Sequence, residues 1–323
     1  MTESAGRLAE LATLRDWLRF AVSRFNRAGL VYGHGTERAL DEAAFIVLAT
    51  LDLDPDDLDP WLDARLTPSE RARLDAVIEA RVATRRPAPY LVGRAYIRGH
   101  RFKCDPRAIV PRSFIGELLC DVLEEGPTHA PAFAVEAPPA RILDLCTGGG
   151  SLAILAAMAF SGAVVDAVDI SSEALALAAE NVAAYGLGDR VRLIEGDLFG
   201  GLAEGRYDLI ISNPPYVTDA SVAAFPPEHR AEPVLAHAGG PDGLDIVRRI
   251  LAEAGSHLEP HGRLVVEVGA GRNAVSASFP DLPFAWIDTT TATGEVLALP
   301  AASLQPGAKA TSAPRRKDRK QSS

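Results

Sequence analysis

The sequence predicts an α/β fold: a doubly wound, mostly parallel sheet with a C-terminal antiparallel hairpin, plus a small N-terminal helical domain. Strands and helices alternate from Arg141 onward, which is the pattern of a parallel sheet covered by helices. The last two predicted strands follow each other without a helix, which indicates the hairpin. Residues 1–86 show helical periodicity alone. With 323 residues, 47% of them hydrophobic, the chain is long enough for both parts.

Three stretches of the N-terminal part carry apolar residues at helical spacing: 8–28, 37–51 and 68–85. Gly29 is the expected C-cap of the first helix, and Thr36 is the expected N-cap of the second. Thr67 and Glu70 form a capping-box pattern at the start of the third helix. We therefore expect residues 1–86 to form a helical domain, which serves either packing or substrate recognition.

Residues 87–139 are expected to join the two parts as a hairpin, a helix and a linker. Short strands are predicted at 90–93 and 96–103, where the period changes, and a helix at 114–124. Residues 126–139 are rich in proline and alanine without periodicity, and this composition predicts a mobile linker.

The region 140–304 supplies the sheet. Its predicted strands are 141–145, 163–168, 191–195, 208–212, 263–268, 284–288 and 296–300, and its predicted helices are 151–161, 172–185 and 243–258.

Charge and cysteine content narrow the function classes. The net charge is −10, while residues 305–323 hold six basic side chains against one acidic, so residues 1–304 carry −15. We expect 305–323 to be a disordered basic tail that either keeps the protein soluble or makes a weak contact with ribosomal RNA. Three widely spaced cysteines fit neither a disulfide framework nor a metal site. With no signal-peptide or membrane-spanning run, this indicates a cytoplasmic protein.

A glycine-rich turn follows the first strand of the sheet region. It contains Asp144, Cys146, Thr147, Gly148 and Gly150. Glycines let a backbone turn sharply and approach a ligand. The carboxylate of Asp144 suits an ammonium group and would repel a pyrophosphate, which argues against a nicotinamide dinucleotide.

The next two strands end in further acids. Asp169 and Ile170 close the second strand, 21 residues past the first glycine, where an acid bonds ribose hydroxyls. Asp197 and Leu198 follow the third strand, where they would bind the amino group and the face of an adenine. An ammonium, a ribose and an adenine without phosphates describe S-adenosyl-L-methionine.

The fourth strand ends in Asn213, Pro214, Pro215 and Tyr216. Two prolines end the strand, because neither donates a ladder hydrogen bond and each fixes φ. The Asn213 side-chain oxygen and the Pro214 carbonyl could accept both hydrogens of a planar amide or amine, with Tyr216 as an aromatic wall. The stretch predicts the acceptor site of a transferase.

The chain resembles the N5-glutamine methyltransferases of the HemK/PrmC superfamily over about residues 10–304. The resemblance is carried by the stretches Asp144 to Gly150, Asn213 to Tyr216, Glu232-Pro233 and Gly240 to Asp245. It implies a class I (Rossmann-like) methyltransferase sheet, S-adenosyl-L-methionine as cofactor, and direct in-line transfer without a metal. It further implies that Asn213, Pro214 and Tyr216 are catalytic, that Asn213 also borders the cofactor, and that the substrate binds along Asn213 to Tyr216.

The junction before the helix at 114–124 distinguishes two branches of this superfamily. Release-factor enzymes carry Pro-Arg-Pro-Glu-Thr-Glu there, whereas this chain has Pro111-Arg112-Ser113-Phe114-Ile115-Gly116-Glu117-Leu118. That stretch and Tyr32 to Thr36 are similar to the PrmB branch, which methylates the third protein of the large ribosomal subunit. Phe114 stands where this branch more often has proline.

Three alternatives stay open at the level of sequence. They are a release-factor glutamine methyltransferase, an N6-adenine methyltransferase acting on nucleic acid, and a non-catalytic ribosome assembly factor. A flipped base would need a basic cleft, and −15 over residues 1–304 argues against one.

Overall fold

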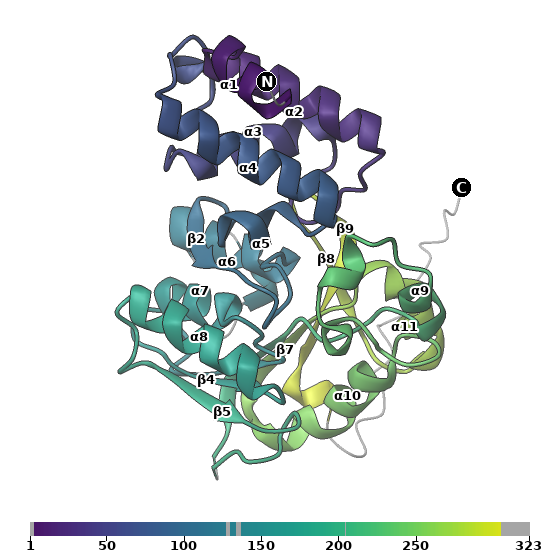
Figure 1. Cartoon of the computed structure of the whole chain (residues 1–323). Helices are drawn as coiled ribbons and strands as arrows, with labels where there is room; N and C mark the ends of the chain where they lie inside the picture. The colour runs from purple at the N-terminus through teal and green to yellow at the C-terminus, as the bar shows by residue number, and fades with distance from the viewer. Residues whose placement is uncertain (1–2, 127–129, 134–136, 204, 305–323) are drawn as a thin grey trace, which may run out of the picture.

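The structure is a computed structural model that describes residues 3–126, 130–133, 137–203 and 205–304 (Figure 1). The N-terminal helices form one body, and the sheet with its covering helices forms the other. The basic tail predicted at 305–323 lies outside the described residues. No helix of the described chain is long and apolar enough to cross a membrane.

The sheet has seven strands in the order β5-β4-β3-β6-β7-β9-β8. The strands are β3 Arg141–Leu145, β4 Val164–Asp169, β5 Val191–Glu195, β6 Tyr207–Ser212, β7 Leu258–Glu267, β8 Ala285–Asp288 and β9 Thr293–Pro300. The first five are parallel, and β9 pairs antiparallel with both β7 and β8. The predicted fold class is confirmed, with β8 as the edge of the hairpin. The chain order reverses between β3 and β6, where ligands bind in such sheets.

Helices cover both faces of the sheet. They are α6 Phe114–Glu125, α7 Ser151–Ala159, α8 Ser172–Ala184, α10 Asp245–His257 and α11 Arg272–Ser278. The short helix α9 Asp219–Ala223 lies in the connection after β6 and buries none of its side chains. Successive side chains of β3 point to opposite faces of the sheet, and both faces are covered. Ile142 packs in the core with α6 and α7, while Leu143 packs in the core with α10. A strand buried on both faces must be apolar throughout, which explains the continuous hydrophobic runs of the central strands.

The N-terminal body consists of α1 Glu3–Glu10, α2 Leu14–Ala28, α3 Ala39–Thr50 and α4 Pro68–Thr84. Trp17, Phe25, Ile46 and Ile78 are fully buried in its own core.

The caps of these helices follow the predictions in two cases out of three. Gly29 closes α2 with φ 58°, and Thr67 forms the capping box of α4 with Glu70. The prediction that Thr36 is the N-cap of the second helix is wrong. The helix α3 begins at Ala39, and the Thr36 hydroxyl instead donates to the Glu42 carboxylate at 3.3 Å.

The junction differs from the prediction in its first element. Residues Ala88–Val92 form the short helix α5, not a strand, because Pro89 suits a helical first turn and Gly93 ends it at φ 70°. The hairpin is β1 Arg94–Ile97 with β2 His100–Lys103, so its turn lies inside the stretch predicted as a single strand. In the predicted linker, Ala130, Ala132 and Phe133 are buried in the sheet core, so this part is packed; 127–129 and 134–136 lie outside the described residues.

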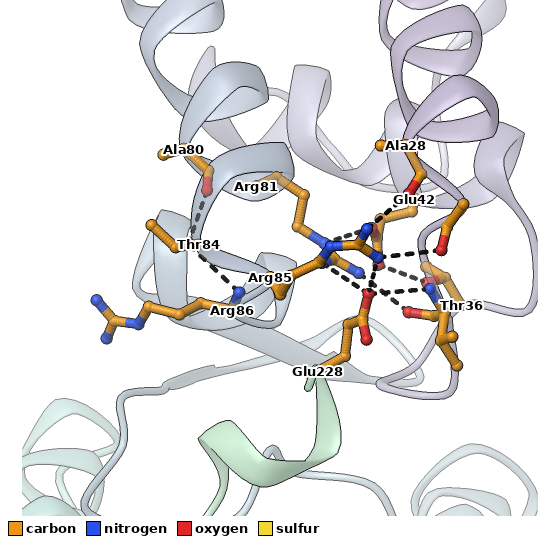
Figure 2. Close-up of polar contacts among 11 residues, drawn as sticks. Ala28, Thr36, Glu42, Ala80, Arg81, Thr84, Arg85, Arg86 and Glu228 are labelled. Carbon is orange, nitrogen blue, oxygen red and sulfur yellow. Dashed lines mark hydrogen bonds and ion pairs between the residues drawn. The ribbon is translucent and has the colours of Figure 1, made fainter. Parts of the chain in front are cut away.

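One glutamate of the sheet-containing body reaches into the N-terminal body (Figure 2). Glu228 Oε1 accepts hydrogen bonds from Arg85 Nη1 at 2.9 Å and from the Val31 amide at 3.1 Å. Arg81 lies beside it and donates from Nε to Glu42 at 2.7 Å. Glu228, Arg81 and Glu42 are buried, so these contacts tie the loop after α9 to the helices.

Candidate active site

A cavity of about 450 Å³ opens at the carboxyl ends of β3, β4 and β6. Most of the residues predicted from the sequence line it: Cys146, Gly148, Asp169, Ile170, Asp197, Leu198, Asn213, Pro214, Pro215 and Tyr216. They come together because the carboxyl ends of parallel strands meet at one edge of the sheet.

Asp144, Thr147 and Gly150 are not part of the cavity wall as the structure stands. The Thr147 hydroxyl donates to Asp144 Oδ2 at 2.6 Å, and Asp144 Oδ1 is buried without a hydrogen-bond partner. Burial raises the pKa of Asp144 to about 7. Gly150 has φ +82°, and a Cβ there would lie 3.1 Å from Ala178 Cβ, so the close packing of α7 on α8 requires this glycine.

Asp169 closes β4 with both carboxylate oxygens engaged by backbone amides. Oδ2 accepts from Gly148 at 2.8 Å, and Oδ1 accepts from Ser171 at 2.9 Å. Burial nonetheless raises the pKa of this carboxyl. Since a carboxylate has about four acceptor positions, Asp169 keeps acceptor capacity for a hydroxyl in the cavity.

Asp197 and Leu198 follow β5. Leu198 is buried with φ 53°, whereas Asp197 is about half exposed and accepts a hydrogen bond from Arg249 Nη2 at 2.9 Å. Arg249 also lines the cavity, and nothing in the sequence pattern singled it out. Ile170 lies at the same end with 52% of its surface exposed, which offers a flat apolar contact to a ligand.

Residues from other segments, Arg112 and Glu267, hold Asn213 and Tyr216 in the turn that follows β6. Asn213 Nδ2 donates to the Arg112 carbonyl at 3.3 Å. The Tyr216 hydroxyl donates to Glu267 Oε1 at 3.3 Å, and burial raises the pKa of Tyr216 and raises that of Glu267 to about 7. Gly269 lies under the ring: a Cβ there would approach Tyr216 Cε2 to 2.6 Å. The aromatic wall is therefore fixed in place.

The far end of the cavity contains residues that sequence reasoning missed as site residues. Gly33 from the N-terminal body and Phe225, His229 and His237 from the loop after α9 line it. Burial, then the neighbouring His34, lower the pKa of His229 to about 4, so His229 is neutral at pH 7. The sequence identifies the stretches around Gly33 and Glu232 as motifs, but it does not predict that their residues reach the cavity.

The donor and acceptor set fits S-adenosyl-L-methionine. An unpartnered buried carboxylate oxygen on Asp144 suits an ammonium, the Asp169 carboxylate suits a ribose, and Ile170 with Leu198 suits an adenine face. Within the described residues no group of three or more His, Cys, Asp or Glu side chains could hold a metal ion.

Fold and cavity together define an S-adenosyl-L-methionine-dependent methyltransferase, and the methyltransferase small domain family matches residues 130–225. Curated relatives are more specific. A ribosomal protein uL3 glutamine methyltransferase of Bordetella pertussis is 54% identical over 90% of this chain and 95% of its own length. Enzymes of the same name from Bradyrhizobium diazoefficiens and Burkholderia pseudomallei are 53% and 50% identical, over 91% and 90% of this chain and 92% and 95% of their own lengths. The chain belongs to the family of ribosomal protein uL3 glutamine methyltransferases.

Proposed function

We propose that this protein transfers a methyl group from S-adenosyl-L-methionine to the side-chain amide nitrogen (N5) of a glutamine in ribosomal protein uL3. The observation that carries the proposal is the Asn213 carboxamide, which the Arg112 carbonyl holds by its nitrogen at the cavity wall. Because the nitrogen of this carboxamide faces the Arg112 carbonyl, its oxygen faces away from that carbonyl. That oxygen is the acceptor that a glutamine amide needs.

The residues act on the substrate amide by positioning it. An amide nitrogen is a poor nucleophile because its lone pair is delocalised. Asn213 Oδ1 and the Pro214 carbonyl accept the two amide hydrogens and aim the nitrogen, while Tyr216 packs on the amide plane. Positioning of this kind supplies about 7–11 kcal/mol in favourable cases. Both acceptors also stabilise the positive charge that grows on nitrogen, and the surplus proton leaves after transfer, to water or to another acceptor.

We assign cofactor binding to the opposite half of the cavity. Bound S-adenosyl-L-methionine supplies an activated methyl group on sulfur. Asp144 accepts from its ammonium, Asp169 accepts from its ribose hydroxyls, and Asp197 accepts from its adenine amino group. Ile170 and Leu198 cover the adenine, and the remaining contacts come from Cys146, Gly148 and Asn213, which line the cavity. Thr147 acts through its hydrogen bond to Asp144, and Gly150 acts through the packing of α7 on α8.

The relatives favour uL3 over a release factor as substrate, because the enzymes that match over nine-tenths of the chain carry the uL3 name. A charge of −15 over residues 1–304 suits a basic ribosomal protein and opposes a nucleic acid in the cleft. We place the reaction in the cytoplasm, where ribosomal proteins are made. We assign to the tail at 305–323 at most a weak contact with ribosomal RNA.

The test is single-turnover transfer of labelled methyl to purified uL3 and, in parallel, to a release factor. Wild-type enzyme should label uL3 and leave the release factor nearly unmodified. Asn213→Ala should lower the rate on the order of 10²–10³-fold, since one pre-aimed polar partner is lost, while the fold and much of the cofactor affinity stay in place. Asn213→Asp keeps an acceptor and should retain more activity than alanine.

Two results would contradict the proposal. Preferential labelling of the release factor would assign the enzyme to the neighbouring branch with the same chemistry. Near-normal transfer by Asn213→Ala would remove Asn213 from the reaction.

A further inference from the structure

A buried glutamate, Glu232, holds the junction segment beside the cavity. Glu232 Oε1 accepts from the Val110 amide at 2.9 Å and from Arg112 Nη1 at 2.7 Å, and Oε2 accepts from Arg112 Nη2 at 2.8 Å. The Glu232 side chain is fully buried, and a two-point contact with a guanidinium fixes direction as well as distance.

The junction is held equally firmly on the other side of Arg112. Glu267 Oε2 accepts from the Ser113 hydroxyl at 2.6 Å and from the Phe114 amide at 2.9 Å. Val110 to Phe114 is thus fixed at both ends by carboxylates from the sheet-containing body. The carbonyl of Arg112, in the middle, has little freedom to move.

That carbonyl is the group that orients Asn213. It accepts the hydrogen bond from Asn213 Nδ2 at 3.3 Å, and a carbonyl oxygen can only accept. If the carbonyl turned away, the carboxamide would lose the hydrogen bond that keeps its nitrogen on the side of Arg112. A rotated carboxamide would present donors to the substrate amide, which needs acceptors.

We propose that Glu232 is a positioning residue for methyl transfer: by holding Arg112, it fixes the carbonyl that turns Asn213 Oδ1 toward the substrate. The inference rests on the proposed role of Asn213. It adds a residue 120 positions from Arg112 in sequence that touches neither substrate nor cofactor.

Glu232 also links this arrangement to the N-terminal body. His34 Nε2 lies 3.4 Å from Glu232 Oε2, and His237 Nε2 lies 3.1 Å from the same oxygen. Burial works to raise the pKa of Glu232, but Arg112 and the two imidazoles outweigh it and hold that pKa well below its usual range. The carboxylate is therefore ionised at neutral pH and keeps Arg112 in place.

The orientation is tested directly by the side-chain amide signals of Asn213 in ¹⁵N-labelled enzyme, assigned by their loss in Asn213→Asp. Glu232→Gln keeps the shape of the side chain but removes the charge, and it should shift or broaden these signals. Arg112→Lys replaces the two-point guanidinium contact by a single ammonium group, and it should have the same effect on the signals. The matched control is Glu42→Gln, since Glu42 is equally buried and arginine-paired but bonds to Arg81 and Thr36 instead of the junction, and it should leave the signals in place.

Kinetics then test the consequence. Glu232→Gln should slow single-turnover transfer on the order of 10- to 100-fold with unchanged cofactor affinity, the scale of a misplaced reacting group. In an Asn213→Asp background the same substitution should have no further effect, because a carboxylate has two equivalent oxygens and no orientation to set.

The outcomes separate this inference from the proposed function. Unshifted Asn213 signals in Glu232→Gln would overturn the positioning role, and so would equal losses of rate in both backgrounds. If wild-type enzyme failed to methylate uL3, the proposed function would fall, and the amide signals would still decide whether Glu232 orients Asn213.

Discussion

Replacing Asp144 by asparagine should change both the pH dependence of stability and that of cofactor binding. The carboxyl is fully buried, it accepts from Thr147 at one oxygen, and its other oxygen has no partner. Burial raises its pKa to about 7, against about 3.9 in an unfolded chain. Folding therefore favours the protonated carboxyl.

The sign and size of the stability effect follow from linkage. Below about pH 4 the carboxyl is protonated in both states. As the pH rises from there, the unfolded chain ionises first, so the folded state loses stability until the pH passes the folded pKa. Between pH 5 and pH 8 the loss from this one group is about 2–3 kcal/mol. Asp144→Asn removes it, so the variant should gain that much relative to wild type between the two pH values in urea unfolding.

Cofactor binding should show the opposite trend. A ligand ammonium favours the ionised carboxylate, so wild-type affinity for S-adenosyl-L-methionine should rise with pH, by up to about tenfold per unit below the folded pKa. Asp144→Asn should bind more weakly at pH 7.5, with less dependence on pH. The amino group of the ligand titrates identically in both experiments, so the ratio of the two affinities isolates Asp144.

Two calorimetric titration series, wild type and variant, between pH 5.5 and 7.5 decide the matter. A ratio of affinities that does not change with pH would refute the ammonium assignment of Asp144. Parallel stability curves for the two proteins would refute the burial argument itself. Glu267, whose pKa burial likewise raises to about 7, acts equally in both proteins and cancels in the comparison.

Three further substitutions test the cavity and the contact between the bodies. Asp169→Ala should weaken S-adenosyl-L-methionine binding by about 1.5–3 kcal/mol, the range for a charged hydrogen-bond partner; Asp197→Ala should cost less, about 1 kcal/mol or below, because this exposed side chain already pairs with Arg249. Equal losses in calorimetry would mean that the ribose site is misplaced. Glu228→Ala should lower the free energy of unfolding by about 1.5–3 kcal/mol, since Arg85 and the Val31 amide lose their charged acceptor while Arg81 keeps Glu42, and a melting curve like that of wild type would contradict this.

The sheet could be predicted from sequence because its strands are apolar runs closed by turn residues. Arg141–Leu145 and Val191–Glu195 have the predicted bounds. The prediction failed where the same pattern of residues is compatible with two kinds of secondary structure. At 90–93, apolar residues between prolines and a glycine suit a strand or a single helical turn, and contacts with α3 and α4 select the turn.

The cofactor half of the cavity was predictable for a related reason. Asp169 is the last residue of β4 and Asn213 directly follows β6, so their position along the chain places them at the sheet edge. Asp144 shows where this logic stops. It also lies near a strand end, yet its side chain is fully buried against Thr147 and does not line the cavity, which its place along the chain does not reveal.

The substrate half depends on contacts between segments far apart in sequence, which no local pattern encodes. The junction that distinguishes the two superfamily branches by sequence is also the segment whose carbonyl accepts from Asn213, so we expect substitutions there to affect both substrate choice and methyl transfer. Phe114 illustrates the coupling. Proline, more frequent here in the branch, would suit the first turn of α6 but has no N–H, whereas the Phe114 amide donates to Glu267 at 2.9 Å. Because Glu267 also accepts from the Tyr216 hydroxyl, this departure ties the start of α6 more closely to the aromatic wall of the acceptor site.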